Sequence, residues 1–314
     1  MINQDYKYTE FCDVKTHVLQ EKSLFIYEQD TEDRSVYCCS ELKANNPTVQ
    51  FVGVVEYAGD KVELMRDGKS IGTLDMHKAT EIYNFTNHEK PTCVYLDVTG
   101  MNCRVAAPIL KVLLKNNIPA KVVYAEPSDY IVEEFQKEGI HKDLSETVDG
   151  VMPLPLFVNL IPYDDDSPVF VTLLGFEGGR FHYLVNNQNP SDDKIRPIVG
   201  VPGYKMNYPY ISLWGNRNVL KLHRCWNHID YAEANSIVDI YFKLDYIFKK
   251  NHKCRMIVAP IGTKPHAIGA IVYAIKHPHE VELLYDNPKR TLHRTKGVGR
   301  VSICDVTRLF NAGL

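Results

Sequence analysis

Residues Cys254–Pro278, CRMIVAPIGTKPHAIGAIVYAIKHP, decide the fold of this chain. Met256–Ala259 is a short apolar run of the kind found in buried strands. A glycine turn interrupts this run, and from Ala267 onward apolar residues recur at the spacing of an amphipathic helix. The stretch therefore predicts a strand, a tight turn and a helix, as in α/β proteins.

The start of that helix is a candidate anion site. Thr263 or Lys264 begins the helix, and Pro265 falls near the first helical position, where its missing N–H costs nothing. A helix start presents unpaired N–H groups and a partial positive charge, to which Lys264 adds a full charge. Gly262, Thr263 and Lys264 are therefore candidate phosphate ligands. The alternative is that Gly262 only allows the chain to reverse.

Length and composition limit the classes of protein to consider. A chain of 314 residues has room for one large domain or two small ones, and 45% hydrophobic with 24% charged residues is typical of a soluble protein. The net charge of −3 does not mark a nucleic-acid or membrane-surface binder. Eight cysteines without CxxC spacing fit reduced thiols. With no signal-peptide pattern and no apolar run of about 20 residues, we expect a cytoplasmic protein without a membrane partner.

Residues 1–90 are predicted to form a small β-rich module. Strands are expected at Leu24–Tyr27, Val36–Cys39, Gln50–Glu56, Val62–Met65 and Ser70–Leu74, with Cys38 and Cys39 on opposite faces of theirs. The last two strands are joined through Asp67-Gly68, the strongest short signal for a hairpin. No chemistry is assigned to this module.

From residue 91 to 314 the pattern predicts a Rossmann-like domain. Thr92–Val98 is a nearly continuous apolar run, typical of a parallel strand that is covered on both faces. A helix at Val105–Leu114, a strand at Ala120–Ala125 and a helix at Ser128–Lys137 follow. This alternation predicts an α/β fold with a mostly parallel sheet and flanking helices.

Ligands of such sheets lie outside the carboxyl ends of the strands. That rule places a group of polar residues on one rim as candidate ligand-binding residues: Asp97, Thr99, Gly100, Arg104 and Glu126. Asp97 either orients a ligand hydroxyl or caps the helix.

The middle of the chain is less regular. Val169–Leu174 predicts a buried strand, and Phe181–Val185 follows across a glycine turn, which favours a hairpin. Glu177 and Arg180 either pair across that turn or lie at the ligand-binding rim. Ile198–Tyr210 is expected to be an ordered loop whose tyrosines offer flat faces to a base.

The last third contains no clear metal site. His223, Cys225 and His228 fit no common zinc spacing, so neither a metal nor a cofactor is predicted. Tyr231–Lys250 predicts a helix and Glu280–Tyr285 a strand. The basic segment from Lys289 to Arg300, which includes Arg290, is either an anion-contacting arm or a solvated loop.

Two turns carry a resemblance to a known family. A unit that opens with Asp97-Val-Thr-Gly100 and closes with Gly262-Thr-Lys-Pro265 resembles the CRISPR-associated Rossmann-fold (CARF-like) sensors, which share such a late Gly-Thr-Lys turn. The resemblance spans residues 91–310 in outline. It implies a homodimer that binds a cyclic oligonucleotide or related nucleotide second messenger, with an effector protein partner, in an antiviral defence or stress system. It also implies that Gly262, Thr263 and Lys264 hold the nucleotide backbone opposite Asp97, Thr99 and Gly100.

The resemblance leaves the question of catalysis open. The Arg-x4-His motif of the ribonucleases commonly fused to these sensors is absent. A catalytic branch of the family cleaves the cyclic nucleotide, and Thr263, Lys264 and His266 would stabilise charge in that chemistry, although no general base is evident. The sequence favours a sensor over an enzyme. The alternatives are a ring nuclease or nucleotide hydrolase, and a non-catalytic scaffold subunit.

Overall fold

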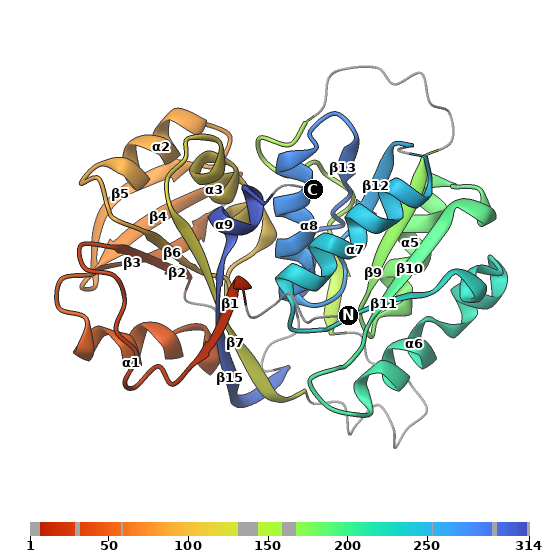
Figure 1. Ribbon diagram of the computed structural model, residues 1–314, viewed down its shortest axis with the longest axis horizontal. Coiled ribbons are helices and arrows are strands. Elements are labelled where there is room, and N and C mark those ends of the chain that lie inside the picture. Colours follow the sequence, from red (N-terminus) through yellow and green to blue (C-terminus); the bar gives the residue numbers. More distant parts are fainter. Residues whose placement is uncertain are drawn as a thin grey trace. The chain divides into compact units, whose positions relative to one another are not determined.

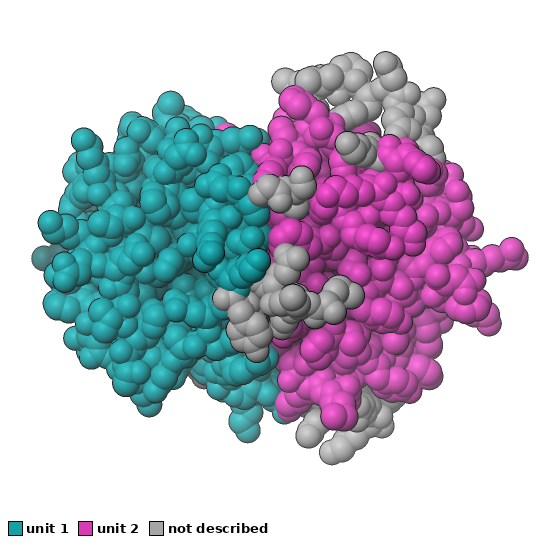
Figure 2. Space-filling model, in the orientation of Figure 1, with its two compact units in different colours: residues 1–131, 292–314 teal, residues 132–291 magenta. Residues whose placement is uncertain are grey.

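The chain forms two compact units (Figure 2). Unit 1 comprises residues 1–131 and 292–314, and unit 2 comprises residues 132–291. The computed structural model describes residues 7–28, 32–57, 59–130, 144–158, 168–252, 254–290 and 294–312. Each unit is an α/β structure with helices that flank a sheet (Figure 1). The sheet of unit 1 has parallel inner strands, and the sheet of unit 2 is parallel throughout.

Unit 1 contains an eight-stranded sheet with the order β1-β15-β7-β6-β2-β3-β4-β5. Its four inner strands, β7, β6, β2 and β3, pair in parallel, and the other pairs are antiparallel. The strands are β1 (Thr9–Cys12), β2 (Leu24–Glu28), β3 (Gln50–Tyr57), β4 (Lys61–Arg66), β5 (Lys69–Asp75), β6 (Val94–Asp97), β7 (Ala120–Tyr130) and β15 (Thr295–Asp305).

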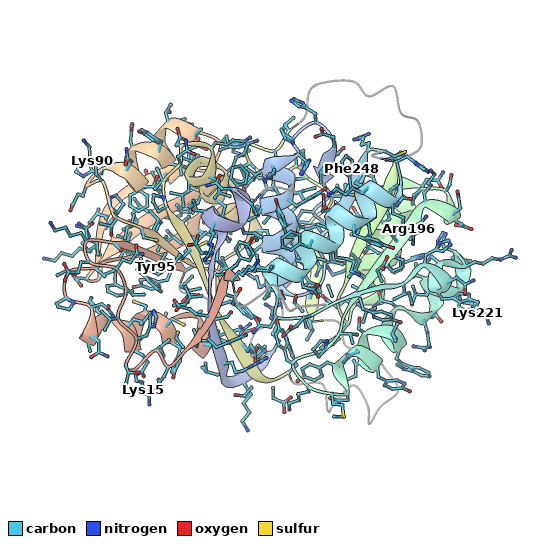
Figure 3. All side chains as sticks on the ribbon, in the orientation of Figure 1. Lys15, Lys90, Tyr95, Arg196, Lys221 and Phe248 are labelled. Carbon is cyan, nitrogen blue, oxygen red and sulfur yellow. The ribbon has the colours of Figure 1, made fainter. Side chains whose placement is uncertain are left out.

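The predicted division into residues 1–90 and 91–314 is corrected by this sheet. Strand β2 of the N-terminal segment pairs in parallel with β6 of the next segment, so both belong to one core. The rings of Phe25 and Tyr95 stack in that core, and Figure 3 labels Tyr95 within it. The N-terminal module therefore does not stand alone.

The helices of unit 1 are α1 (Tyr37–Asn45), α2 (Ala79–Asn87), α3 (Cys103–Lys115) and α9 (Val306–Phe310). The strand predicted at Val36–Cys39 is wrong, because α1 begins there. Cys38, Cys39 and Leu42 are all buried, which is the spacing of one helix face rather than of two strand faces. A helix is needed here because the parallel strands β2 and β3 require a crossover. The hairpin through Asp67 and Gly68 is confirmed, with φ values of 49° and 75°.

Unit 2 contains a five-stranded, fully parallel sheet with the order β11-β10-β9-β12-β13. The chain runs outward from β9 to β11 and then returns to β12 on the other side of β9. The strand order thus reverses between β9 and β12, the position at which such sheets bind ligands. The strands are β9 (Val169–Leu174), β10 (Ile195–Gly200), β11 (Asp230–Ala232), β12 (Met256–Ala259) and β13 (Val281–Leu283).

Two pairs of helices flank this sheet. Helix α5 (Gly178–Gln188) packs against α6 (Tyr208–Leu222), and α7 (Ile237–Lys250) packs against α8 (Lys264–Lys276) (Figure 1). Strands β8 (Ser145–Val148) and β14 (Pro288–Arg290) form a separate antiparallel ribbon. The strand and helix predicted from Met256–Ala259 and Ala267 onward are confirmed as β12 and α8.

Four predictions for the region between residues 128 and 231 are wrong. The loop expected at Ile198–Tyr210 is shorter at both ends, because its first residues belong to β10 and its last residues to α6. No hairpin follows β9, because Phe181–Val185 lies in α5, where Phe181, Leu184 and Val185 form a buried helical stripe. Ser128 belongs to β7 rather than to a helix, and residues 131–137 lie outside the described part of the chain. Tyr231 belongs to β11, so the helix predicted from this residue begins at Ile237.

Within the described ranges, no helix combines the length and the apolar character needed to cross a membrane.

Candidate functional site

Two glycine turns meet where the strand order of unit 2 reverses. Gly175 follows β9, and Gly262 lies shortly after β12. A Cβ atom on Gly175 would lie 2.8 Å from the carbonyl oxygen of Ile261, and one on Gly262 would lie 2.9 Å from those of Leu173 and Leu174. These distances are too short for any side chain, so only glycine allows the two backbones to lie against each other here.

Thr263 fixes the start of α8. Its Oγ1 accepts a hydrogen bond from the backbone N–H of His266 at 3.3 Å and donates one to the carbonyl oxygen of Ala234 at 2.7 Å. The predicted helix start is therefore confirmed, with Thr263 as the N-cap. Lys264 is the first residue of the helix and is half-buried. Gly262, Thr263 and Lys264 lie together in one turn, as the sequence suggested.

His266 is buried and connects two segments of unit 2 by a hydrogen bond. It is completely buried, and its Nε2 lies 2.9 Å from the carbonyl oxygen of Glu233. Burial lowers the pKa of His266 to about 4, so the ring is neutral at pH 7 and donates to that carbonyl. His266 and Thr263 together hold the segment that follows β11 against α8.

A buried ion cluster holds the turn after β9. The Arg180 guanidinium donates two hydrogen bonds to Asp286, at 2.7 and 2.6 Å, and its third nitrogen reaches Glu177 at 3.2 Å and the Ile261 carbonyl oxygen at 3.3 Å. Burial disfavours the charged guanidinium, but the hydrogen bonds and charge of Asp286 outweigh it, and the pKa of Arg180 is raised. Glu177 and Arg180 thus pair with each other, as one of the two alternatives predicted.

Asp286 and a pair of α6 residues were not foreseen as part of this site. Asn216 and Ser212 donate hydrogen bonds to the Gly175 carbonyl oxygen at 2.8 and 2.9 Å. The signal for Asp286 was its position directly after the last strand of the sheet. The signal for α6 was Gly215, because a Cβ atom there would lie 2.1 Å from the Phe176 carbonyl oxygen. Neither signal can be interpreted without knowing which elements are neighbours.

In unit 1, Asp97 and Thr99 form a buried turn at the end of β6. Asp97 Oδ1 accepts from the Thr99 backbone N–H at 2.9 Å, and Thr99 Oγ1 accepts from the Ala125 N–H at 2.9 Å. Asp97 is fully buried, and burial raises its pKa to about 6, against the opposing effect of hydrogen bonds from Thr99 and Cys38. Asp97 therefore caps a turn, while Asn102 caps α3. Gly100 is buried in the same turn.

The other predicted residues of this rim form ion pairs. Arg104 pairs with Asp60, and Glu126 lies 3.0 Å from Arg300. A neighbouring network that the sequence did not reveal links Glu32 to Arg294 at 2.8 Å, and to further residues, namely Arg34 and Thr295. These partners come from the two ends of the chain, so no local pattern could have joined them.

The two predicted halves of the site belong to different sheets. Asp97, Thr99 and Gly100 are in unit 1, and Gly262, Thr263 and Lys264 are in unit 2. The prediction of one crevice at the edge of one sheet is therefore wrong, because the chain forms two sheets rather than one. Arg290 belongs to β14, and its side chain lies outside the described part of the structure.

The histidines of the last third have other partners. His223 lies 2.7 Å from Asp192, and His228 lies 3.2 Å from Arg196. In the parts of the chain that the structure describes, no three His, Cys, Asp or Glu side chains are arranged to hold a metal ion.

Comparison with known proteins gives little information. The sequence matches no protein-family model and no curated protein. Among solved structures, the chain is similar to CobK precorrin-6A reductase, with 10% identity over 87% of this chain and 90% of that chain, and a TM-score of 0.23. A likeness this weak carries no functional argument, so the function has to be inferred from the geometry.

Proposed function

We propose that this protein is a sensor that binds a nucleotide second messenger at the carboxyl ends of β9 and β12 in unit 2. The observation that carries the proposal is the meeting of two glycine turns, after β9 and before α8, at the reversal of the strand order. Sheets of this type bind ligands at the reversal of the strand order, and the helix start there is electropositive, which suits a phosphate group.

In this proposal, some of the predicted residues bind the phosphate and others position the turn that binds it. The side chains of Thr263 and His266 are bonded to the segment after β11, so these residues position the turn. The backbone of Gly262 and the ammonium group of Lys264 are then the phosphate ligands. Arg180 is held by two carboxylates and is a support for the turn after β9 rather than an anion receptor.

A tyrosine next to this turn is the candidate contact for the base. The hydroxyl of Tyr204 donates to the Ala234 carbonyl oxygen at 3.3 Å, the same oxygen that receives the Thr263 hydroxyl. The Tyr204 ring is thereby held next to the start of α8. Tyrosine faces bind bases of any sequence by stacking, which suits a nucleotide ligand.

The remaining parts of the proposal come from the resemblance to CARF-like sensors. They are a homodimer, a cyclic oligonucleotide as the messenger, a cytoplasmic role in antiviral defence or stress, and an effector partner. Unit 1 would pass the signal to that partner.

Ligand binding tests the proposal directly. Thermal unfolding of unit 2 is followed with cyclic oligoadenylates, with linear adenine nucleotides and with inorganic phosphate. A ligand at 100 times its dissociation constant stabilises the folded state by about 2.7 kcal/mol. Lys264→Ala should weaken binding at least about tenfold, since it removes a charge-assisted phosphate contact. Lys221→Ala is the matched control, because Lys221 lies exposed on α6 (Figure 3). Unchanged affinity in Lys264→Ala refutes the phosphate role.

One observation favours a second candidate, an enzyme on the same scaffold. Glu177 is 7% exposed, and its Oε1 is buried without a hydrogen-bond partner among the described residues. A carboxylate at this rim would serve as the general base that the sequence lacked in a ring nuclease or nucleotide hydrolase. Chromatography of incubated nucleotides separates the two: products that disappear with Glu177→Gln indicate the enzyme, and binding without products indicates the sensor.

A further inference from the structure

Unit 1 contains a cavity at the amino ends of its parallel strands, the edge of the sheet opposite to the one at which Asp97 ends β6. Its volume is about 450 Å³, within the range of small-molecule sites. The first residues of β2 and β3, the segment before β6, strands β4 and β5, and the end of α2 line it. Its lining residues all belong to unit 1, whereas the site proposed above consists of residues of unit 2.

A fixed guanidinium group supplies positive charge to this cavity. Arg66, at the end of β4, donates from a terminal nitrogen to Gln50 Oε1 at 2.9 Å, and the Gln50 amide in turn donates to Glu89. This chain of contacts orients Arg66. Its Nε–H is buried and has no acceptor among the residues that the structure describes. The guanidinium carries a full positive charge at the lining of the cavity, where an anionic ligand would form charge-assisted hydrogen bonds with it. Lys22 adds a second cation to the lining.

Another part of the lining is apolar. Leu64 is buried, Phe85 is half-buried, and Ile71 on β5 is 46% exposed although it lines the cavity. Exposed aliphatic surface beside a ring forms a place for the apolar body of a ligand, whose burial is favourable. The cavity therefore pairs a cationic end with an apolar wall.

The charge balance selects the type of anion. Arg66 and Lys22 supply two positive charges, and Glu89, which also lines the cavity, supplies one negative charge; His88, the other titratable residue of the lining, is counted as neutral. The remaining single positive charge matches a monoanion, while a phosphate dianion would meet the Glu89 carboxylate nearby. The planar fork of Arg66 suits a carboxylate.

We propose that this cavity binds a small organic carboxylate with an apolar or aromatic body, with its carboxylate on Arg66 and its body against Leu64, Ile71 and Phe85.

Calorimetry on the full chain tests this with phenylacetate, indole-3-acetate and hexanoate, each compared with its uncharged amide and with phenyl phosphate. We expect at least one carboxylate to bind, and to bind at least tenfold more tightly than its amide and than phenyl phosphate. No carboxylate binding at about 5 mM, or equal binding of the amide, overturns the proposal. Tighter binding of phenyl phosphate overturns the assignment of a monoanion.

Two variants locate the binding site. Arg66→Gln should weaken carboxylate binding at least tenfold, and Ile71→Ser should weaken it severalfold through the exposed wall without a risk to the core. Arg308→Gln, an exposed arginine on α9, is the matched control and should leave affinity unchanged. Because Arg66 also holds Gln50, circular dichroism confirms that Arg66→Gln is folded. Carboxylate affinity unchanged in both Arg66→Gln and Ile71→Ser places the ligand elsewhere and refutes the proposal.

Discussion

Replacement of the buried carboxyl group of Asp97 should change the stability of unit 1 in a pH-dependent way. Burial raises the pKa of Asp97 from 3.8 to about 6, so the folded state binds its proton more tightly than the unfolded chain. This contribution to stability is fully present below pH 3.8 and is lost as the pH rises through 6. A shift of about two pKa units corresponds to about 3 kcal/mol.

Asp97→Asn removes the charge but keeps an oxygen for the Thr99 N–H. We therefore expect the variant to match the wild type near pH 4 and to gain up to about 3 kcal/mol of unfolding free energy relative to it near pH 7.5. The apolar surroundings and the hydrogen bond from the Thr99 N–H are the same in both proteins, so the pH-dependent part of the difference in unfolding free energy isolates the carboxylate.

The assay has to report on unit 1 alone. The chain has two tryptophans, Trp214 and Trp226, and both lie in unit 2, so tryptophan fluorescence follows the other unit. Amide hydrogen exchange of β6 and β7, corrected for the intrinsic pH dependence of exchange, gives the stability of unit 1. Asp13→Asn, at an exposed aspartate, is the matched control for the substitution itself. The explanation would be refuted if Asp97→Asn and the wild type differed in unfolding free energy by the same amount at pH 4 and at pH 7.5.

Two further predictions concern unit 2 and are measured by urea unfolding with tryptophan fluorescence. Burial lowers the pKa of His266 from 6.5 to about 4, so its contribution of about 3 kcal/mol to the free energy of unfolding is present above pH 6.5 and is lost as the pH falls through 4. His266→Gln should flatten this dependence of the unfolding free energy on pH. A pH dependence in the variant that runs parallel to that of the wild type would contradict the prediction. Asp286→Ala should destabilise unit 2 by about 3–5 kcal/mol, because it removes the main partner of the buried Arg180 charge. The triple replacement Glu177→Gln, Arg180→Met and Asp286→Leu removes all the charges of this cluster and should recover much of the loss; equal losses in both variants would contradict this account.

Local patterns in the sequence were enough where a short stretch decides its own structure. The helix start at Thr263 follows from a capping hydroxyl, a proline at the first turn and apolar residues at helical spacing, all within one segment. The Asp67-Gly68 hairpin follows from residues that tolerate positive φ. Prediction failed at Phe181–Val185, where a short apolar run after glycines fits a strand or a helix equally well. Only its packing in the buried face of α5 decides between them.

The sequence by itself determined the α/β class, the parallel core strands and the turn at Gly262–Lys264, because periodicity and turn chemistry act over a few residues. The tertiary structure decided which strands share a sheet, and so assigned Asp97 and Lys264 to different sheets and joined Arg180 to Asp286, 106 residues apart. It also formed the cavity at Arg66, by packing β2, β3, β4, β5 and the end of α2 around one space. Contacts between distant residues depend on how elements pack against one another, and no local pattern carries that information.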